Sequence, residues 1–198
     1  QDVKYAEDLG FRIKHLGIAR RTDAGIELRV HPTLIPEEEL IANVNGVKNA
    51  VLVQANAVGP TLYYGAGAGA GPTASAVVAD VVDIVRDIIY TEDGAGTIPQ
   101  LAFEALTDLP ILSREQMTTG YYIRINAEDQ MGVLADVTTI LSRAGISIDA
   151  IMQQPRLKDL IPIVILTDPI VESKMDAALS QIQALPVIHG EIVRIRLE

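Results

Sequence analysis

The sequence Tyr64-Gly-Ala-Gly-Ala-Gly-Ala-Gly-Pro-Thr-Ala-Ser-Ala-Val-Val-Ala-Asp80 joins glycines that alternate with alanine to the start of an amphipathic helix. The glycines leave the main chain bare just before a helix N-terminus, where backbone N–H groups can approach a flat or anionic ligand. Pro72 suits the first helical position, because the N–H it lacks has no intrahelical partner there. The spacing of the later valines and isoleucines predicts a helix over residues 72–90 with one apolar face.

This glycine run does not match a standard phosphate-binding motif. A dinucleotide fingerprint that begins with Gly65 and Gly67 would need glycine at position 70, which is alanine. A P-loop would need Gly-Lys-Ser/Thr, which is also missing. Two interpretations stay open: main chain that contacts a ligand, or a tight strand-to-helix turn that lets two backbones approach.

The composition limits the classes of protein to consider. The chain has 198 residues, is 48% hydrophobic, and contains no cysteine. It can therefore form a core without disulfides, and zinc-finger and thiol chemistry are excluded. A formal net charge of −10 argues against nucleic acids and anionic membranes as partners. With no apolar run of membrane-spanning length and no signal peptide, we expect a cytoplasmic protein. The start without methionine suggests a fragment of a longer chain.

The expected fold class is α+β, with a mixed β-sheet and helices in residues 1–90. The expected elements of this block are strands at 13–19, 25–30, 50–55 and 60–64, a short helix at 37–44, and the helix at 72–90. Residues 91–119 are expected to be a linker, with a short helix near 100–106, because they contain few periodic signals.

Residues 120–198 have the pattern of a second unit. The expected elements are strands at 121–126, 146–153, 160–167 and 192–197, a helix at 131–144, and a second helix that opens at Asp168-Pro169. This βαββαβ order is the ferredoxin-like plan.

Side chains typical of catalysis or metal binding are scattered. Asp80, Asp83 and Asp87 share the polar face of the 72–90 helix, where a solvated face with Arg86 paired to Asp83 is favoured over a metal site. The histidines, His15, His31 and His189, lack ligand spacing, and no Ser/His/Asp order or carboxylate pair stands out. No metal site is predicted.

The loop 126–132 joins the first strand of the second unit to its first helix. Gly132 permits a close approach there, and the free amides of the helix start could bind a carboxylate. The alternative is a plain N-cap, with Asp129 as the capping residue.

Several strings in order resemble the C-terminal half of homoserine dehydrogenases. They are Ile13-Lys-His-Leu-Gly-Ile-Ala19, Arg29-Val-His-Pro-Thr-Leu-Ile-Pro36, Gly46-Val-x-Asn-Ala50, and Tyr64-Gly-x-Gly-Ala-Gly69 with Pro72-Thr-Ala-Ser-Ala-Val-Val78. Residues 120–198 resemble an ACT domain, a small ligand-sensing module, through Asp129-x-x-Gly132-Val-Leu-Ala135 and Gly145-Ile-Ser-Ile148.

The resemblance implies an NAD(P)-dependent oxidoreductase that interconverts L-homoserine and L-aspartate 4-semialdehyde in threonine and methionine biosynthesis. It implies coenzyme contacts for Gly65, Gly67 and Gly69, and it gives Gly71 no such role. The family's coenzyme-binding half, and the segment with its catalytic lysine and acidic residues, match nothing in this sequence. No catalytic residue is therefore predicted, the chain alone is expected to be inactive, and NAD versus NADP stays open.

For the ACT domain, the resemblance implies feedback control by an amino acid, with threonine as first choice. The candidate effector residues are Asn126, Asp129, Gly132, Ile146 and Ser147. The expected assembly is a homodimer or homotetramer. The alternatives are a non-catalytic ACT-containing amino-acid sensor and an oligomerisation module.

Overall fold

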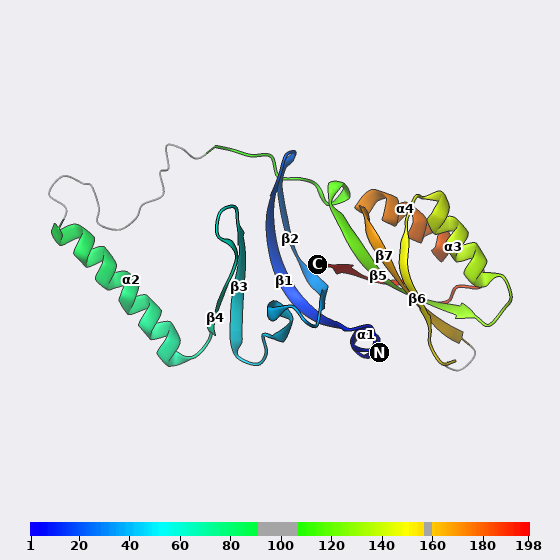
Figure 1. Cartoon of the computed structure of the whole chain (residues 1–198), viewed down its shortest axis with the longest axis horizontal. Helices are drawn as coiled ribbons and strands as arrows, with labels where there is room; N and C mark the ends of the chain where they lie inside the picture. Colours follow the sequence, from blue (N-terminus) through cyan, green and yellow to red (C-terminus); the bar gives the residue numbers. More distant parts are fainter. Residues whose placement is uncertain (91–106, 157–159) are drawn as a thin grey trace. The chain divides into compact units, whose positions relative to one another are not determined.

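The computed structural model describes residues 1–90, 107–156 and 160–198, with the side chain of Tyr90 left out (Figure 1). It divides into two compact units. Unit 1 comprises Gln1–Ala42 and Leu109–Glu198, and unit 2 comprises Asn43–Asp108. The expected short helix near 100–106 lies outside the described residues, and the domain boundaries at 90 and 120 stay predictions.

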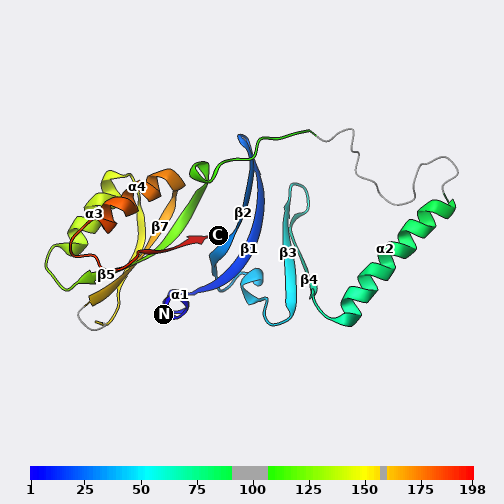
Figure 2. The same ribbon diagram turned by 180° about the vertical axis from the view of Figure 1, so that it is seen from behind.

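Unit 1 contains the expected ferredoxin-like plan. Its elements are β5 (Thr118–Glu128), α3 (Val133–Arg143), β6 (Ile148–Gln153), β7 (Leu160–Val171), α4 (Glu172–Gln183) and β8 (Val193–Leu197). The strands lie in the order β8-β5-β7-β6, and each neighbouring pair is antiparallel. Both helices cover the same face of this sheet, as Figures 1 and 2 show from opposite sides.

A long hairpin continues the same sheet. β1 (Phe11–Thr22) and β2 (Gly25–Pro36) pair antiparallel across a tight turn, and β2 adds to β8 in parallel at only Thr33↔Arg196 and Leu34↔Leu197. The result is a six-stranded mixed sheet, in the order β1-β2-β8-β5-β7-β6. The prediction of a mixed sheet in an α+β fold is confirmed.

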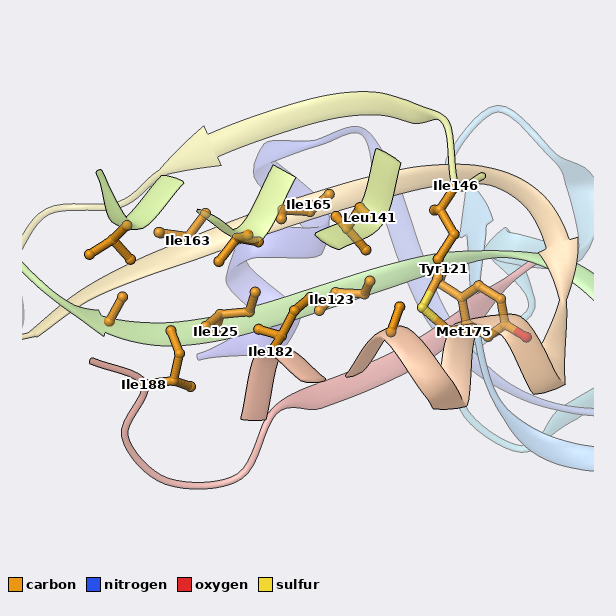
Figure 3. Close-up of a cluster of buried hydrophobic side chains, with 14 residues drawn as sticks. Tyr121, Ile123, Ile125, Leu141, Ile146, Ile163, Ile165, Met175, Ile182 and Ile188 are labelled. Atoms are coloured by element: carbon orange, nitrogen blue, oxygen red, sulfur yellow. The ribbon is translucent and has the colours of Figure 1, made fainter. Parts of the chain in front are cut away.

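The main core lies between the sheet and the helices α3 and α4. Alternate side chains of β5 and β7 point toward these helices, as the two-residue period of a strand requires (Figure 3). Fully buried members include Ile123, Ile125, Leu141, Ile165, Met175 and Ile182. The helices are therefore held by apolar faces that the sequence pattern predicts.

The face of this sheet opposite α3 and α4 is also covered. α1 (Asp2–Asp8) lies against it, and Ala6 is buried with Tyr122, Val164 and Leu166 in a second cluster. Tyr122 alternates with the residues of the main core along β5, so its side chain belongs to this other face. Residues before the β1–β2 hairpin are thus packed against the sheet that β5, β6, β7 and β8 form.

Unit 2 is a hairpin followed by a long helix. β3 (Lys48–Ala55) pairs antiparallel with β4 (Gly59–Ala66), and α2 (Ala70–Tyr90) follows. The apolar side chains of α2 are 40–74% exposed: Val77, Val78, Val81, Val82, Ile84, Val85, Ile88 and Ile89. Among the described residues, no helix has the length and apolarity needed to cross a membrane.

Several predicted boundaries were wrong. The helix expected at 37–44 is only a 3₁₀ turn, η1 (Leu40–Asn43). The second helix of this plan does not open at Asp168-Pro169, because β7 continues through a β-bulge at these residues and pairs with β5 again at Ile170 and Val171. Part of the expected linker is fixed to β2, where Ile26 N donates to Pro110 O (2.8 Å) and Leu112 N donates to Ile26 O (2.9 Å).

Candidate functional site

The glycine run forms the connection between β4 and α2. Gly65 lies in β4, opposite Asn49 of β3, and α2 begins at Ala70. Gly69 has φ +123°, a conformation that L side chains rarely adopt, so the turn needs glycine at this position. Thr73 N donates to Gly69 O (3.1 Å) and closes the first turn of the helix.

The space beside these glycines differs from one to the next. A Cβ added to Gly65 or Gly71 would meet no atom of the described residues within 4 Å, so a ligand could approach the backbone at Gly65. At Gly67 the same Cβ would lie 1.7 Å from Asn49 Nδ2 and 2.6 Å from its Cγ. The missing side chain of Gly67 therefore makes room for Asn49.

The loop 128–132, between β5 and α3, borders a small cavity of about 140 Å³, roughly five water volumes. Its lining includes Asp129, Gln130 and Gly132 from the loop and Gln153 from β6. The N-cap of α3 is Gly132, with φ +94° and no side-chain capping bond, so the prediction that Asp129 caps this helix was wrong. Asp129 instead forms an exposed ion pair with Arg156 (3.7 Å).

Asn126 connects this loop to α1 through Arg124. Asn126 Oδ1 accepts from Arg124 Nη1 (3.0 Å), and Arg124 Nε donates to Asp2 Oδ1 (2.5 Å), which also accepts from Tyr122 (2.9 Å). Partial burial would raise the pKa of Asp2, but the hydrogen bonds from Arg124 and Tyr122 outweigh it and hold that pKa below its ordinary value. Asn126 thus lies in a network between β5 and α1.

Ile146 and Ser147 lie at the other end of α3 from the loop. The helix has 11 residues, so the two places are roughly 16 Å apart. Ile146 is buried in the main core, and the exposed Ser147 accepts at its carbonyl oxygen from Asp168 N (3.1 Å). The structure therefore brings together Asp129 and Gly132, but not Ile146 and Ser147 with them.

Unit 1 also buries a charged cluster around Glu172, the first residue of α4. Its carboxylate is fully buried, and it accepts hydrogen bonds from Tyr121 Oη (2.8 Å) and Arg196 Nε (2.9 Å). Arg194 Nη2 lies 3.2 Å away and Arg114 Nε 3.9 Å away. Burial would raise the pKa of Glu172, but the bonds from Arg196 and Tyr121 outweigh it and hold the pKa below its ordinary 4.5.

The remaining sequence candidates do not form a site. Arg86 pairs with Asp83 at 3.4 Å on the exposed face of α2. In the described parts of the chain, no group of three or more His, Cys, Asp or Glu side chains could hold a metal ion. His189 pairs with Glu128 (2.7 Å), the last residue of β5.

Sequence reasoning missed Asn49, Glu172 and the Asp2–Arg124 pair. Asn49 stands in the string Gly46-Val-x-Asn-Ala50, which was noted only for its resemblance. Glu172 follows an apolar strand with no motif around it. Only the fold shows that Arg194 and Arg196 of β8 lie next to its carboxylate. Asp2 and Arg124 are 122 residues apart in the sequence.

A family model described as Homoserine dehydrogenase matches residues 1–82, and one described as ACT domain matches residues 121–186. A homoserine dehydrogenase of Pseudomonas aeruginosa is 55% identical over 201 residues, which cover 100% of this chain and 46% of that protein. One of Neisseria gonorrhoeae is 49% identical with the same coverage.

A solved structure gives the same result. The crystal structure of a homoserine dehydrogenase from Thiobacillus denitrificans matches with a TM-score of 0.90 and 56% identity. The match covers 100% of this chain and 44% of that one. The chain therefore spans about half the length of the relatives that it matches.

Proposed function

The chain belongs to the homoserine dehydrogenase family, and we propose that it forms the subunit-association and regulatory part of an NAD(P)-dependent homoserine dehydrogenase. The reaction would interconvert L-homoserine and L-aspartate 4-semialdehyde in threonine and methionine biosynthesis, in the cytoplasm. The observation on which this rests is the 55% identity to a homoserine dehydrogenase over all of this chain. The nicotinamide would supply the hydride chemistry, and the protein would position it.

The glycine run fits a coenzyme at one position in particular. Gly65 leaves open space beside its backbone, and the run ends at the N-terminus of α2, whose first amides have no intrahelical partner. Both features suit a close approach by a dinucleotide. Gly67 fits this role less directly, since Asn49 fills the space beside it.

A further lobe would cover the exposed apolar side chains of unit 2. α2 exposes its apolar residues, and Val51, Val53 and Tyr63 on one face of the β3–β4 hairpin are also 41–66% exposed. An isolated two-stranded hairpin is only marginally stable in water. We propose that the coenzyme-binding half of the enzyme packs on α2, and that a homodimer or homotetramer covers exposed strands of the hairpins.

Replacing Gly65 with valine in the full-length enzyme tests the coenzyme assignment. We expect the KM for the coenzyme to rise about tenfold or more, because the new side chain occupies the space the coenzyme would need. The melting temperature should hardly change, since no atom in the described part of this chain lies within 4 Å of the added Cβ. Steady-state kinetics with varied coenzyme and differential scanning calorimetry provide the two measurements.

Ala57→Val is the matched control for this test. Ala57 is exposed in the turn at the far end of the same hairpin. It should leave the KM unchanged. A Gly65→Val enzyme with the KM of the wild type would refute the placement of the coenzyme.

We propose that the cavity beside loop 128–132 binds an amino-acid effector, with threonine as first choice. The free amides at the start of α3 would bind its carboxylate, and Asp129 would attract its ammonium group. The polar side chains of Gln130 and Gln153 on the cavity wall would bind the remaining polar group. Coupling to activity would then follow from different effector affinities in two states of the enzyme.

Titration calorimetry of residues 1–198 with L-threonine tests this site. We expect saturable heat for the wild type and its loss in Gly132→Ala, since alanine at φ +94° would distort the loop beside the cavity. Gly10→Ala is the control, because Gly10 also has positive φ (+80°) but lies in the turn between α1 and β1. If Gly132→Ala gives the same saturable heat as the wild type and Gly10→Ala, loop 128–132 is excluded as the binding site.

A further inference from the structure

The side chain of Asn49 lies against the glycine run. A Cβ added to Gly67 would be 1.7 Å from Asn49 Nδ2, 2.6 Å from Cγ and 3.2 Å from Cβ. Non-bonded atoms cannot approach so closely, so any side chain at position 67 must displace the carboxamide of Asn49. The two positions are therefore sterically linked.

Strand pairing explains how Asn49 reaches this place. Asn49 of β3 faces Gly65 of β4 in the antiparallel ladder. Gly65 contributes no side chain opposite it, which leaves the carboxamide free to lie along the turn toward Gly67. The Gly–Ala run has high backbone freedom, so a side chain packed against it restricts the conformations it can adopt.

The carboxamide has polar capacity that the chain does not use. Asn49 is exposed, and within the described part of the chain its side chain forms no hydrogen bond. An asparagine amide offers two N–H donors and a carbonyl acceptor. The ammonium of the adjacent Lys48 lies over the ring of Tyr64, 5.7 Å from its centroid. The amide of Asn49 lies directly opposite the bare backbone of Gly65.

We propose that Asn49 is a positioning residue for the coenzyme: packed against Gly67, it holds the 65–69 turn in the conformation that receives the dinucleotide. This rests on the proposed function. Losing the contact would leave a looser turn, which must be ordered when the coenzyme binds. The effect should therefore appear in coenzyme affinity more than in the rate of the chemical step.

A double-mutant cycle in the full-length enzyme tests the role. We expect Asn49→Ala to raise the coenzyme KM about tenfold with kcat within about twofold, and Gly67→Ala to raise it similarly through the clash. Asn49→Ala removes the two atoms closest to position 67 and leaves a Cβ contact of 3.2 Å, which a small shift relieves. Adding Gly67→Ala to Asn49→Ala should therefore raise the KM less than about threefold further.

The outcomes separate this proposal from the function on which it rests. If Gly67→Ala costs as much in the Asn49→Ala background as in the wild type, the coenzyme itself fills that space, and the positioning role is overturned. Asn49→Ala with an unchanged KM also overturns it, while a raised KM in Gly65→Val would still support the coenzyme site. Asn56→Ala, an exposed asparagine in the far turn of the hairpin, is the control and should have no effect. Melting curves of all variants exclude loss of folding as the cause.

Discussion

Glu172→Ala is expected to lower the unfolding free energy of unit 1 by about 3–5 kcal/mol, as when one partner of a buried ion pair is removed. The wild-type carboxylate is fully buried and is bonded by Tyr121 and Arg196. Alanine would leave the guanidinium groups of Arg194 and Arg196, which are 21% and 16% exposed, facing each other without their shared acceptor. Their mutual repulsion adds to the cost of the lost hydrogen bonds.

Urea unfolding of residues 1–198, followed by circular dichroism, measures this effect. Glu191→Ala is the matched control, because Glu191 is an exposed glutamate in the same unit, and it should change the free energy by less than about 0.5 kcal/mol. A loss below about 1 kcal/mol for Glu172→Ala would mean that the cluster is accessible to water in solution.

The carboxylate of Glu172 also makes the free energy of unfolding depend on pH in a defined direction. Because its pKa is lower in the folded than in the unfolded chain, its contribution is complete above the ordinary value of 4.5 and is lost as pH falls through the lowered value. Between about pH 5 and about pH 3, the wild type should therefore lose stability more steeply than Glu172→Gln. If the unfolding free energies of the wild type and Glu172→Gln fell in parallel over this pH range, the lowered pKa of Glu172 would be contradicted.

The sequence predicted the fold wherever local patterning and tertiary packing agree. The βαββαβ order followed from two-residue and 3.6-residue periods, and β5, α3 and β7 bury the faces that those periods select. The errors lie where tertiary pairing overrides local signals. β7 runs through Asp168-Pro169 because β5 continues beside it to Thr118. The residues near Pro169 carry no local sequence signal of that pairing.

The candidate sites divide in the same way. The bare backbone at Gly65 was predicted from its composition, and the structure leaves it open. Its relation to Asn49 could not be predicted, because it depends on the register Asn49↔Gly65 between two strands. Likewise, Asp129 looked like a capping residue, but Gly132 adopts a left-handed conformation that starts the helix three residues later. A contact between residues distant in sequence leaves no local signal from which it could be predicted.

The ACT part is expected to fail as a free-standing module, although its resemblance to a separable domain suggests otherwise. Without residues 1–42, Tyr122, Val164 and Leu166 would lose the cover of α1 and the β1–β2 hairpin, since all three are at most 3% exposed in the whole chain. Each fully buried side chain of this kind contributes about 1.5–3 kcal/mol. Together, the three side chains contribute a free energy comparable to the whole stability of a small domain.

We therefore expect a fragment of residues 109–198 to bind a hydrophobic dye strongly and to associate, while residues 1–198 unfold cooperatively. Dye fluorescence and sedimentation velocity measure the two properties.

The same fragment with Tyr122, Val164 and Leu166 all replaced by threonine is the control. It keeps β-strand propensity while removing the exposed apolar face, so it should bind less dye and stay dispersed. A wild-type fragment that melts cooperatively at the temperature of the whole chain would show that α1 and the hairpin contribute little. In that case effector binding could be measured on the fragment as well as on the whole chain. If the fragment does not fold in this way, effector binding has to be measured on residues 1–198, which preserve the network from Asn126 through Arg124 to Asp2.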